Sequence, residues 1–475
     1  MPAERLTRES AKLKTGIVHL GLGAFFRAHG AIYTAEAAAK SGGDWGITGV
    51  SLQSSRMRDA LAPQDFAYSG LEFGPEGETP ERIEIVSDIL VARENPQAVL
   101  DVMADPDVRI VSLTITEKGY CHSPATGALD PDHPDIVHDM ANDLPVSAPG
   151  YLVRALQLRH ARGLRPFTAM SCDNLPENGR LLRGVVLDLA RRIDPELADW
   201  IAAEGRFPST MVDRIVPATK PEDIARLEEL AGWHDALPVM HEPFRQWVIE
   251  DDFVDGERPD WGAVGVEMVS DVTPFEHMKL RMLNGTHSSL AYLGYLAGFE
   301  TISDTMDDEV MADFVRYLWR DEIIPSLTPP PGVSLERYAD ALAERYANPA
   351  IRHRTWQIAM DGSQKLPQRI LATVADALKA GRSCPGLMLA IAAWMRYVGG
   401  VDESGQPIEV KDPLAAELRA LSDSAADAEG KVAALLSLRS VFPPELAQSL
   451  QAPVTEAYRT LVEKGARAAV REVLQ

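Results

Sequence analysis

The hydrophobic repeat of this chain changes once, near residue 272, and this change restricts the fold more than any other feature of the sequence. Before that point, short β-like runs alternate with segments of helical periodicity, a pattern typical of a parallel sheet covered by helices. After it, the chain reads as successive amphipathic helices. A chain of 475 residues is too long for one hydrophobic core. We therefore predict an α/β protein: a doubly wound sheet with inserted β elements over residues 1–272, and a mostly α-helical domain over residues 273–475.

Individual elements can be assigned within each half. The predicted strands of the first half cover residues 16–23, 45–52, 108–116 and 165–172, and two of its helices cover residues 149–163 and 178–192. Residues 66–89 alternate apolar and polar side chains around a Gly/Pro/Glu turn, which predicts an inserted antiparallel pair outside the main sheet. The predicted helices of the second half cover residues 275–297, 304–321, 335–346, 364–379, 386–398 and 454–472.

The balance of charge and the few cysteines exclude several classes of partner. The chain has 70 acidic and 47 basic residues and a formal net charge of −23, which repels nucleic acids and anionic lipid surfaces. Its three cysteines, Cys121, Cys172 and Cys384, lack the spacing of a disulfide framework. The N-terminal residues are charged, and no run of 18 apolar residues occurs. We expect a cytoplasmic protein that binds small molecules and neither nucleic acid nor membrane; the sequence predicts no oligomeric state.

The first predicted strand ends in a glycine turn. In "IVHLGLGAFFRAH", Gly21 and Gly23 follow an apolar strand and precede a predicted helix, a context in which glycines let the backbone turn tightly and approach a pyrophosphate. Phe26 stands in place of the third glycine of the G-x-G-x-x-G pattern, and a plain strand-to-helix turn is the alternative. The position at the first strand favours a Rossmann-like dinucleotide-binding domain. We assign the following residues to the cofactor: Ile17, Gly21, Gly23, Ala24, Phe25, Phe26 and Arg27.

The end of the second predicted strand bears on the choice between NAD and NADP. NAD-binding domains of this kind usually carry Asp or Glu there to bind the ribose. In "GVSLQSSRMRD" the corresponding positions hold three serines, a glutamine and Arg56, and the nearest acid is Asp59. We therefore expect NAD and keep NADP as an alternative.

The first helix of the second half carries a polar face. Around "KLRMLNGTHSS", residues 279–289, an α-helical turn of about 100° per residue places Glu276 about 60°, His287 about 80° and Asn284 about 140° from Lys279. Taken singly, each would be a satisfied polar group in a core. A partly desolvated lysine, however, can take the proton of a hydroxyl as hydride leaves the same carbon. Asn284 and His287 can then donate hydrogen bonds to the oxygen.

Two other dehydrogenase chemistries lack their residues. No tyrosine is followed four residues later by lysine, as in the tyrosine-lysine pair of short-chain dehydrogenases. The cysteines and histidines form no convincing tetrahedral zinc site. Among the dehydrogenase mechanisms considered, the one that uses a lysine as acid/base and needs no metal remains, and we therefore predict no metal site.

Seven blocks occur in order between residue 16 and about residue 370: "GIVHLGLGAFFRAH", "SLTITEKGYC", "MSCDNLPENG", "FPSTMVDRIVP", "EPFRQWVIEDDF", "KLRMLNGTHSSLAYLGYLAG" and "DGSQKLPQR". Together they resemble the long-chain mannitol dehydrogenase and uronate reductase family of polyol-specific dehydrogenases. The resemblance implies that Lys279 is the general acid/base, that Asn284 and Asn174 polarise the reacting oxygen, and that His287 contacts substrate.

The same resemblance suggests further roles. Asp213 of "MVDR" and Lys365 of "DGSQK" would contact hydroxyl or carboxyl groups of the substrate, and Glu276 would be a proton gate to solvent. Glu117 and Lys118 follow a strand end, where open α/β sheets bind ligands, so they would border the cofactor. A surface ion pair is the alternative for these two residues.

The substrate is chosen on one segment. "RHRTWQIAMDGSQKLPQR" resembles the branch that reduces keto-uronates such as D-fructuronate to D-mannonate, whereas polyol-oxidising members tend to carry Arg where Gln357 stands. The directions of Arg352, His353 and Arg354 stay open. We predict NAD-dependent interconversion of D-fructuronate and D-mannonate. The alternatives are a mannitol 2-dehydrogenase or related enzyme of D-mannitol, D-fructose or D-arabinitol, and a dinucleotide-binding sensor without catalysis; a sugar-phosphate dehydrogenase lacks a second phosphate cradle.

Overall fold

The parallel sheet expected in the N-terminal half is present in the computed structural model, which describes residues 3–74, 77–123 and 126–475. The chain divides into two units, Met1–Thr273 (unit 1) and Pro274–Gln475 (unit 2). The sheet of unit 1 has five strands, all parallel, in the order β6-β3-β2-β7-β8. Their bounds are Val86–Val91, Gly46–Ser51, Thr15–Leu20, Ile110–Leu113 and Thr168–Ser171. The α/β fold class is therefore confirmed.

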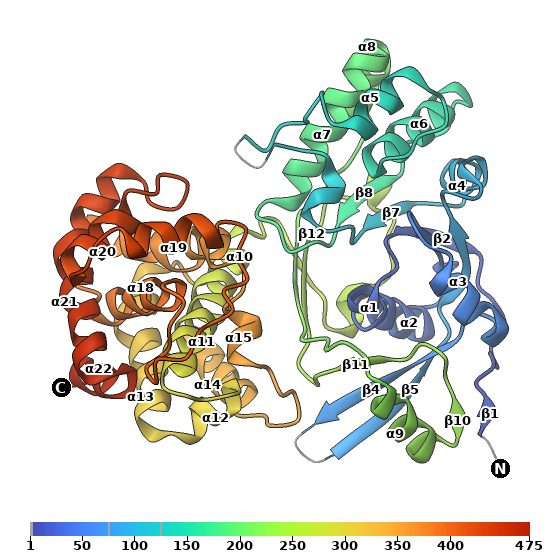
Figure 1. Cartoon of the computed structure of the whole chain (residues 1–475). Coiled ribbons are helices and arrows are strands. Elements are labelled where there is room, and N and C mark those ends of the chain that lie inside the picture. The colour runs from blue at the N-terminus through green and yellow to red at the C-terminus, as the bar shows by residue number, and fades with distance from the viewer. Residues whose placement is uncertain (1–2, 75–76, 124–125) are drawn as a thin grey trace. The chain divides into compact units, whose positions relative to one another are not determined.

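Helices cover both faces of this sheet because its strands are apolar on both sides (Figure 1). On β2, Val18 and Leu20 belong to one hydrophobic core and Ile17 belongs to the other. The first core is shared with α4 (Pro96–Met103), α5 (Pro134–Ala141), α6 (Ala148–Ala161), α7 (Asn178–Ile193) and α8 (Pro195–Glu204). The second is shared with α2 (Gly30–Ser41) and the strand β12 (Gln246–Glu250).

Smaller sheets complete unit 1, and one of them corrects a prediction. β4 (Tyr68–Gly74) and β5 (Gly77–Ile83) form the expected antiparallel pair, with β11 (Val239–His241) beside β4. The end of the same segment, however, is β6, an edge strand of the main sheet. The alternating pattern of "VSDILV" does not distinguish the two cases, because an edge strand of the main sheet and a strand of an inserted hairpin each expose one face. The remaining strands are β9 (Thr210–Asp213), β13 (Glu267–Val269), β1 (Glu4–Arg5) and β10 (Trp233–His234), and the other α-helices are α1 (Ala24–Arg27), α3 (Arg56–Leu61) and α9 (Pro221–Ala231).

Unit 2 is helical, and its described residues form no strand. Its central helix is α18 (Pro385–Val398), which is buried over nearly its whole length and packs against α11 (Thr286–Leu296) and α21 (Pro444–Lys464). The surrounding helices are α12 (Ile302–Asp307), α13 (Glu309–Tyr317), α14 (Leu335–Tyr346), α15 (Thr355–Ile358), α16 (Gly362–Leu366), α17 (Ala372–Lys379), α19 (Ala415–Asp423), α20 (Ala428–Leu436) and α22 (Ala466–Val473).

Several helix predictions in unit 2 need correction. The helix expected over 304–321 is divided into α12, α13 and a π-helical segment η6 (Leu318–Ile323), and the helix expected over 364–379 contains a π-helical segment η8 (Pro367–Leu371) between α16 and α17. The segment 454–472 is not one helix, because Gly465, at φ +82°, separates α21 from α22. Helices α19 and α20 carry no prediction at all. The helix expected over 275–297 is α10 (Thr273–Met278), a π-helical segment η5 (Lys279–Gly285) and α11. No helix among the described residues is long and apolar enough to cross a bilayer.

Candidate active site

The turn after β2 has the backbone that a dinucleotide requires. Gly21 lies at φ +85°, which side chains rarely adopt, and a Cβ there would lie 2.2 Å from the carbonyl oxygen of Thr114. At Gly23 a Cβ would meet nothing closer than the Gly21 carbonyl oxygen at 3.7 Å. The space over Gly23 is thus open, as close approach of a pyrophosphate needs. The turn therefore fits a dinucleotide.

Side chains next to this turn correct part of the predicted cofactor site. Gly21, Gly23, Ala24 and Phe25 keep partial exposure. Phe26 instead stacks on His19, with ring centroids 3.4 Å apart, and occupies the place of the third glycine as part of the core. The helix also breaks after one turn, so α1 (Ala24–Arg27) is followed separately by α2.

The cofactor contacts of Ile17 and Arg27 stay predictions, and they would have to be made by backbone atoms because both side chains are buried. Ile17 is buried near the beginning of β2, away from the carboxyl end where ligands bind. Arg27 is also buried: its guanidinium donates to the Leu237 carbonyl oxygen (2.6 Å) and lies over the Tyr68 ring. The guanidinium of Arg27 therefore interacts with groups in the core of unit 1.

Two glycine substitutions should separate folding from cofactor binding. Gly23→Ala should leave the melting temperature nearly unchanged, because its Cβ meets open space, but weaken NADH binding about tenfold or more by displacing the pyrophosphate. Gly21→Ala should lower stability by several kcal/mol through its positive φ and the clash with Thr114. Thermal unfolding and fluorescence titration with NADH measure the two effects. Tight NADH binding by Gly23→Ala would show that the turn does not hold the dinucleotide.

The other predicted site residues of unit 1 lie at or near the ends of strands, three of them at the carboxyl ends of β7 and β8. Glu117 and Lys118 are exposed in the 3-10 turn after β7, and Asn174 is exposed just after β8. Asp213 ends β9 and is buried, opposite Gln246 of β12. The structure thus places Glu117, Lys118 and Asn174 at the sheet edge where Rossmann folds bind ligands.

In unit 2, the predicted helix face is buried and its backbone is π-helical. Glu276, Lys279, Asn284 and His287 are each exposed by only 6–8%. The π-helical segment η5 runs from Lys279 to Gly285, so the helical turn is wider there than the α-helical turn that we assumed. An α-helix would hold Lys279 and Asn284 about 140° apart, whereas i→i+5 pairing brings residues five positions apart close to one face. The π-helical turn therefore places Lys279 and Asn284 closer to the same face of the helix than the predicted α-helical turn would.

Basic side chains surround His287. We call His287, Arg345, His353, Lys365 and Arg369 the basic cluster. The imidazole rings of His287 and His353 meet edge to face with centroids 4.7 Å apart, and Tyr346 stacks on the His287 ring at 5.1 Å. Burial lowers the pKa of His287 well below its ordinary value, and the four groups that act on it most strongly, all basic, lower it further. His287 is therefore neutral at pH 7.

The three basic residues 352–354 point in different directions. Arg352 and Arg354 are exposed, and Arg354 lies 3.6 Å from Glu300. His353 is turned inward: its Nδ1 is buried and has no hydrogen-bond partner among the described residues, and burial lowers its pKa to about 4. The Lys365 ammonium donates to the Met360 carbonyl oxygen (2.5 Å) and faces the same cluster.

The family follows from comparison of the sequence with known proteins. Residues 15–263 match the family described as mannitol dehydrogenase Rossmann domain, and residues 271–462 match the mannitol dehydrogenase C-terminal domain. The chain belongs to the mannitol dehydrogenase family. Its members oxidise secondary alcohols without a metal, so the predicted family and enzyme class are confirmed.

Relatives within the mannitol dehydrogenase family differ in substrate. The chain is 47% identical to D-mannonate oxidoreductase of Escherichia coli over 99% of this chain and 98% of that protein. It is 41% identical to mannitol 2-dehydrogenase of Phaeosphaeria nodorum over 98% of this chain and 82% of that protein. Among solved structures, Pseudomonas fluorescens mannitol 2-dehydrogenase in ternary complex with NAD and D-mannitol has a TM-score of 0.86 and 38% identity, covering 100% of this chain and 97% of that one.

Motif matching missed one positioning residue, Asp173. Its carboxylate accepts hydrogen bonds from the backbone N–H groups of Ile115 (2.9 Å) and Thr116 (3.0 Å) and from the Tyr120 hydroxyl (2.7 Å). Asp173 therefore ties the loop after β7 to the loop after β8, next to Asn174. The signal in the sequence was its place in "SCDN", one residue before the predicted asparagine.

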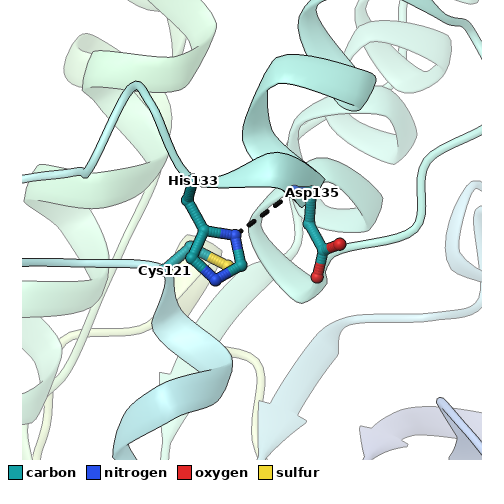
Figure 2. Close-up of side chains that lie close together, drawn as sticks. All are labelled: Cys121, His133 and Asp135. Atoms are coloured by element: carbon teal, nitrogen blue, oxygen red, sulfur yellow. Dashed lines mark hydrogen bonds between the residues drawn. The ribbon is translucent and has the colours of Figure 1, made fainter.

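A group of potential metal ligands lies elsewhere in unit 1 (Figure 2). One ligand atom each of Cys121, His133 and Asp135 lies within 4.8 Å of the others. His133 already caps α5 by accepting from the Asp135 backbone N–H (3.3 Å), and burial raises the pKa of the Cys121 thiol to about 12. His133 thus has a structural role, and we assign none of the three residues a part in the reaction.

Proposed function

We propose that this protein interconverts D-fructuronate and D-mannonate, with NAD as its cofactor. The observation that favours a sugar acid over a neutral polyol is the basic cluster around His287. Among its members, His287 and Arg345 are buried, and His353, Lys365 and Arg369 are partly exposed, in a chain whose net charge is −23. Positive charges gathered in one partly desolvated place favour the binding of an anion.

A substrate carboxylate meets the needs of this cluster. The unpartnered Nδ1 of His353 can donate one hydrogen bond, and the Lys365 ammonium keeps a donor beyond its two backbone carbonyl acceptors. Arg369, whose guanidinium donates to Ser288 (3.1 Å), adds a positive charge close by. A neutral polyol would offer hydroxyl groups but no charge to this cluster.

The reduction requires two transfers, a hydride to the carbonyl carbon and a proton to the carbonyl oxygen. When bound at the glycine turn, NADH would supply the hydride for the C5 carbonyl carbon of D-fructuronate. Lys279 donates a proton to the carbonyl oxygen, and Asn284 donates a hydrogen bond to the same oxygen as negative charge develops on it. Asn174 is assigned the same role as Asn284. The neutral lysine then regains a proton from solvent through Glu276, one turn earlier on the helix.

The remaining assignments concern cofactor and substrate contacts. The open glycine turn at Gly21 and Gly23, with Ala24 and Phe25, holds the pyrophosphate, and Glu117 and Lys118 border the cofactor. Neutral His287 contacts a substrate hydroxyl, as does Asp213. No metal takes part, and the buried free cysteines suit a reducing cytoplasm.

The substrate is tested by comparing D-fructuronate with D-fructose in NADH oxidation at neutral pH. We expect kcat/KM for D-fructuronate to exceed that for D-fructose by about 100-fold or more, since a buried charge pair contributes several kcal/mol to transition-state binding. A preference for D-fructose would contradict the proposal and identify a mannitol 2-dehydrogenase. No turnover with either sugar, with NADH binding intact, would point to a sensor.

A further inference from the structure

The end of β3 lies where Rossmann folds bind the adenosine ribose. β3 pairs with β2, the strand that leads into the glycine turn, and is therefore the second strand of the nucleotide-binding half. At this point a carboxylate usually binds the ribose 2′-hydroxyl of NAD, while an arginine accommodates the 2′-phosphate of NADP. Residues 51–56 read S-L-Q-S-S-R and contain no carboxylate.

The carboxylates that follow the ends of β3 and β6 in the sequence, Asp59 and Glu94, are already engaged. Arg58 donates to Asp59 Oδ1 (2.8 Å) and forms a short ion pair with Glu94. Asp59 also lies three residues beyond Arg56, on α3. Neither acid therefore replaces the missing ribose ligand.

Two more arginines flank the same strand end. Arg56 begins α3, and Arg93 follows β6, whose last residue, Val91, is in register with Ser51 of β3. The Ala92 N–H donates to the Ser51 carbonyl oxygen (2.9 Å), so the two strand ends are joined. Both arginine side chains are exposed, and neither forms a hydrogen bond or ion pair with another described residue. The two strand ends are thus followed by three arginines and only two carboxylates, although the chain as a whole is strongly negative.

We propose that the strand ends at Ser51 and Val91 bind the 2′-phosphate of NADP(H) through Arg56 and Arg93, so that the protein uses NADP(H) as well as NAD(H). Guanidinium groups bind phosphate with two charge-assisted hydrogen bonds, and the two exposed arginines provide such donors. The hydroxyl and amide groups of residues 51–55 can still bind a ribose 2′-hydroxyl, which keeps NAD acceptable. The proposal concerns cofactor choice and does not depend on which sugar is reduced.

The test uses the adenosine fragments of the two cofactors, so that neither turnover nor the nicotinamide enters. Isothermal titration of the full chain with 2′,5′-ADP and with 5′-AMP compares ligands that differ by the 2′-phosphate. We expect 2′,5′-ADP to bind about tenfold or more tightly, and NADH to displace both. The double variant Arg56→Ala/Arg93→Ala should bind the two fragments about equally, with its affinity for 5′-AMP unchanged.

Controls separate a specific site from general charge. Arg191→Ala removes an exposed arginine from the end of α7 and should leave both affinities unchanged. Ser54→Asp should lower the affinity for NADPH relative to that for NADH about tenfold or more, by repulsion of the 2′-phosphate, as measured by cofactor fluorescence. Equal binding of the two fragments by the unaltered protein would overturn the proposal. An equal loss of both fragments in the double variant would do so too.

Discussion

Replacing Lys279 by methionine is expected to lower kcat by about 10³-fold or more while leaving the Kd for NADH unchanged. The side chain is only 6% exposed, and methionine is similar in length and apolar, so the helix should keep its packing. The loss arises because neither Asn284 of η5 nor His287 of α11 can replace Lys279 as the proton donor to the carbonyl oxygen: His287 is held neutral by burial, and Asn284 does not titrate. Stopped-flow reduction of the preferred sugar measures the chemical step, and fluorescence titration measures NADH binding.

Two further variants separate proton transfer from charge. Lys279→Arg keeps the positive charge but has a group that does not release its proton near neutral pH, so it should be almost as inactive as Lys279→Met. Lys379→Met removes an exposed lysine at the end of α17 and should keep full activity. If Lys279→Met retained a rate within tenfold of the unaltered enzyme, another residue would have to be the acid/base.

The grouping of Lys279 with Asn284 was predictable in outline but not in geometry. The spacing K-x-x-x-x-N shows that the two residues belong to one helix, and an α-helical turn then places them far apart on its face. The wider turn of η5 depends on tertiary packing: a Cβ at Gly285 would lie 2.6 Å from the Arg369 carbonyl oxygen, so η5 and the η8 segment (Pro367–Leu371) approach closely. Contacts such as the one between Gly285 and Arg369, which are 84 residues apart, leave no local periodic signal.

In the glycine turn, too, features that depend on local sequence could be predicted, and features that depend on tertiary packing could not. Gly21 and Gly23 could be recognised because the turn demands their backbone freedom directly. Phe26 and Arg27 were assigned to the cofactor because they are adjacent in sequence, yet their side chains pack on His19 and Tyr68, which come from elsewhere in the unit. Sequence proximity to a turn therefore identified backbone contacts better than side-chain contacts.

The family was identified correctly from motifs, whereas the electrostatics that bear on the substrate needed the structure. Arg352, His353 and Arg354 are consecutive, and no periodic rule states which of them turns inward when the backbone at Arg352 is at φ +47°. Arg345 carried no prediction because it sits in an amphipathic helix, where an arginine is ordinarily exposed. The inward turn of His353 and the burial of Arg345 become visible only when the segments that contain them are folded together.

Replacing Lys365 by glutamine should reverse the preference for a sugar acid. Glutamine can still donate to the Met360 carbonyl oxygen, so the local fold should persist, but the positive charge is lost. Because removing one partner of a buried charge pair costs several kcal/mol, kcat/KM for D-fructuronate should fall about 100-fold. D-Fructose, which binds through neutral hydroxyl groups, should lose less than about tenfold. Equal losses for both sugars would show that Lys365 does not recognise the carboxylate.

The same lysine should make sugar-acid recognition depend on pH. Burial and then Arg369 lower the pKa of Lys365 to about 8, so its charge is present below that pH and is lost as the pH rises through it. The ratio of kcat/KM for D-fructuronate to that for D-fructose should therefore fall above pH 8, by up to about tenfold per unit, and taking the ratio cancels the titration of Lys279, which both sugars share. The other groups that act on Lys365 are Arg369, Asp361 and Asp412. Lys365→Gln should abolish the dependence, and a ratio that stayed constant in the unaltered enzyme would place the carboxylate elsewhere.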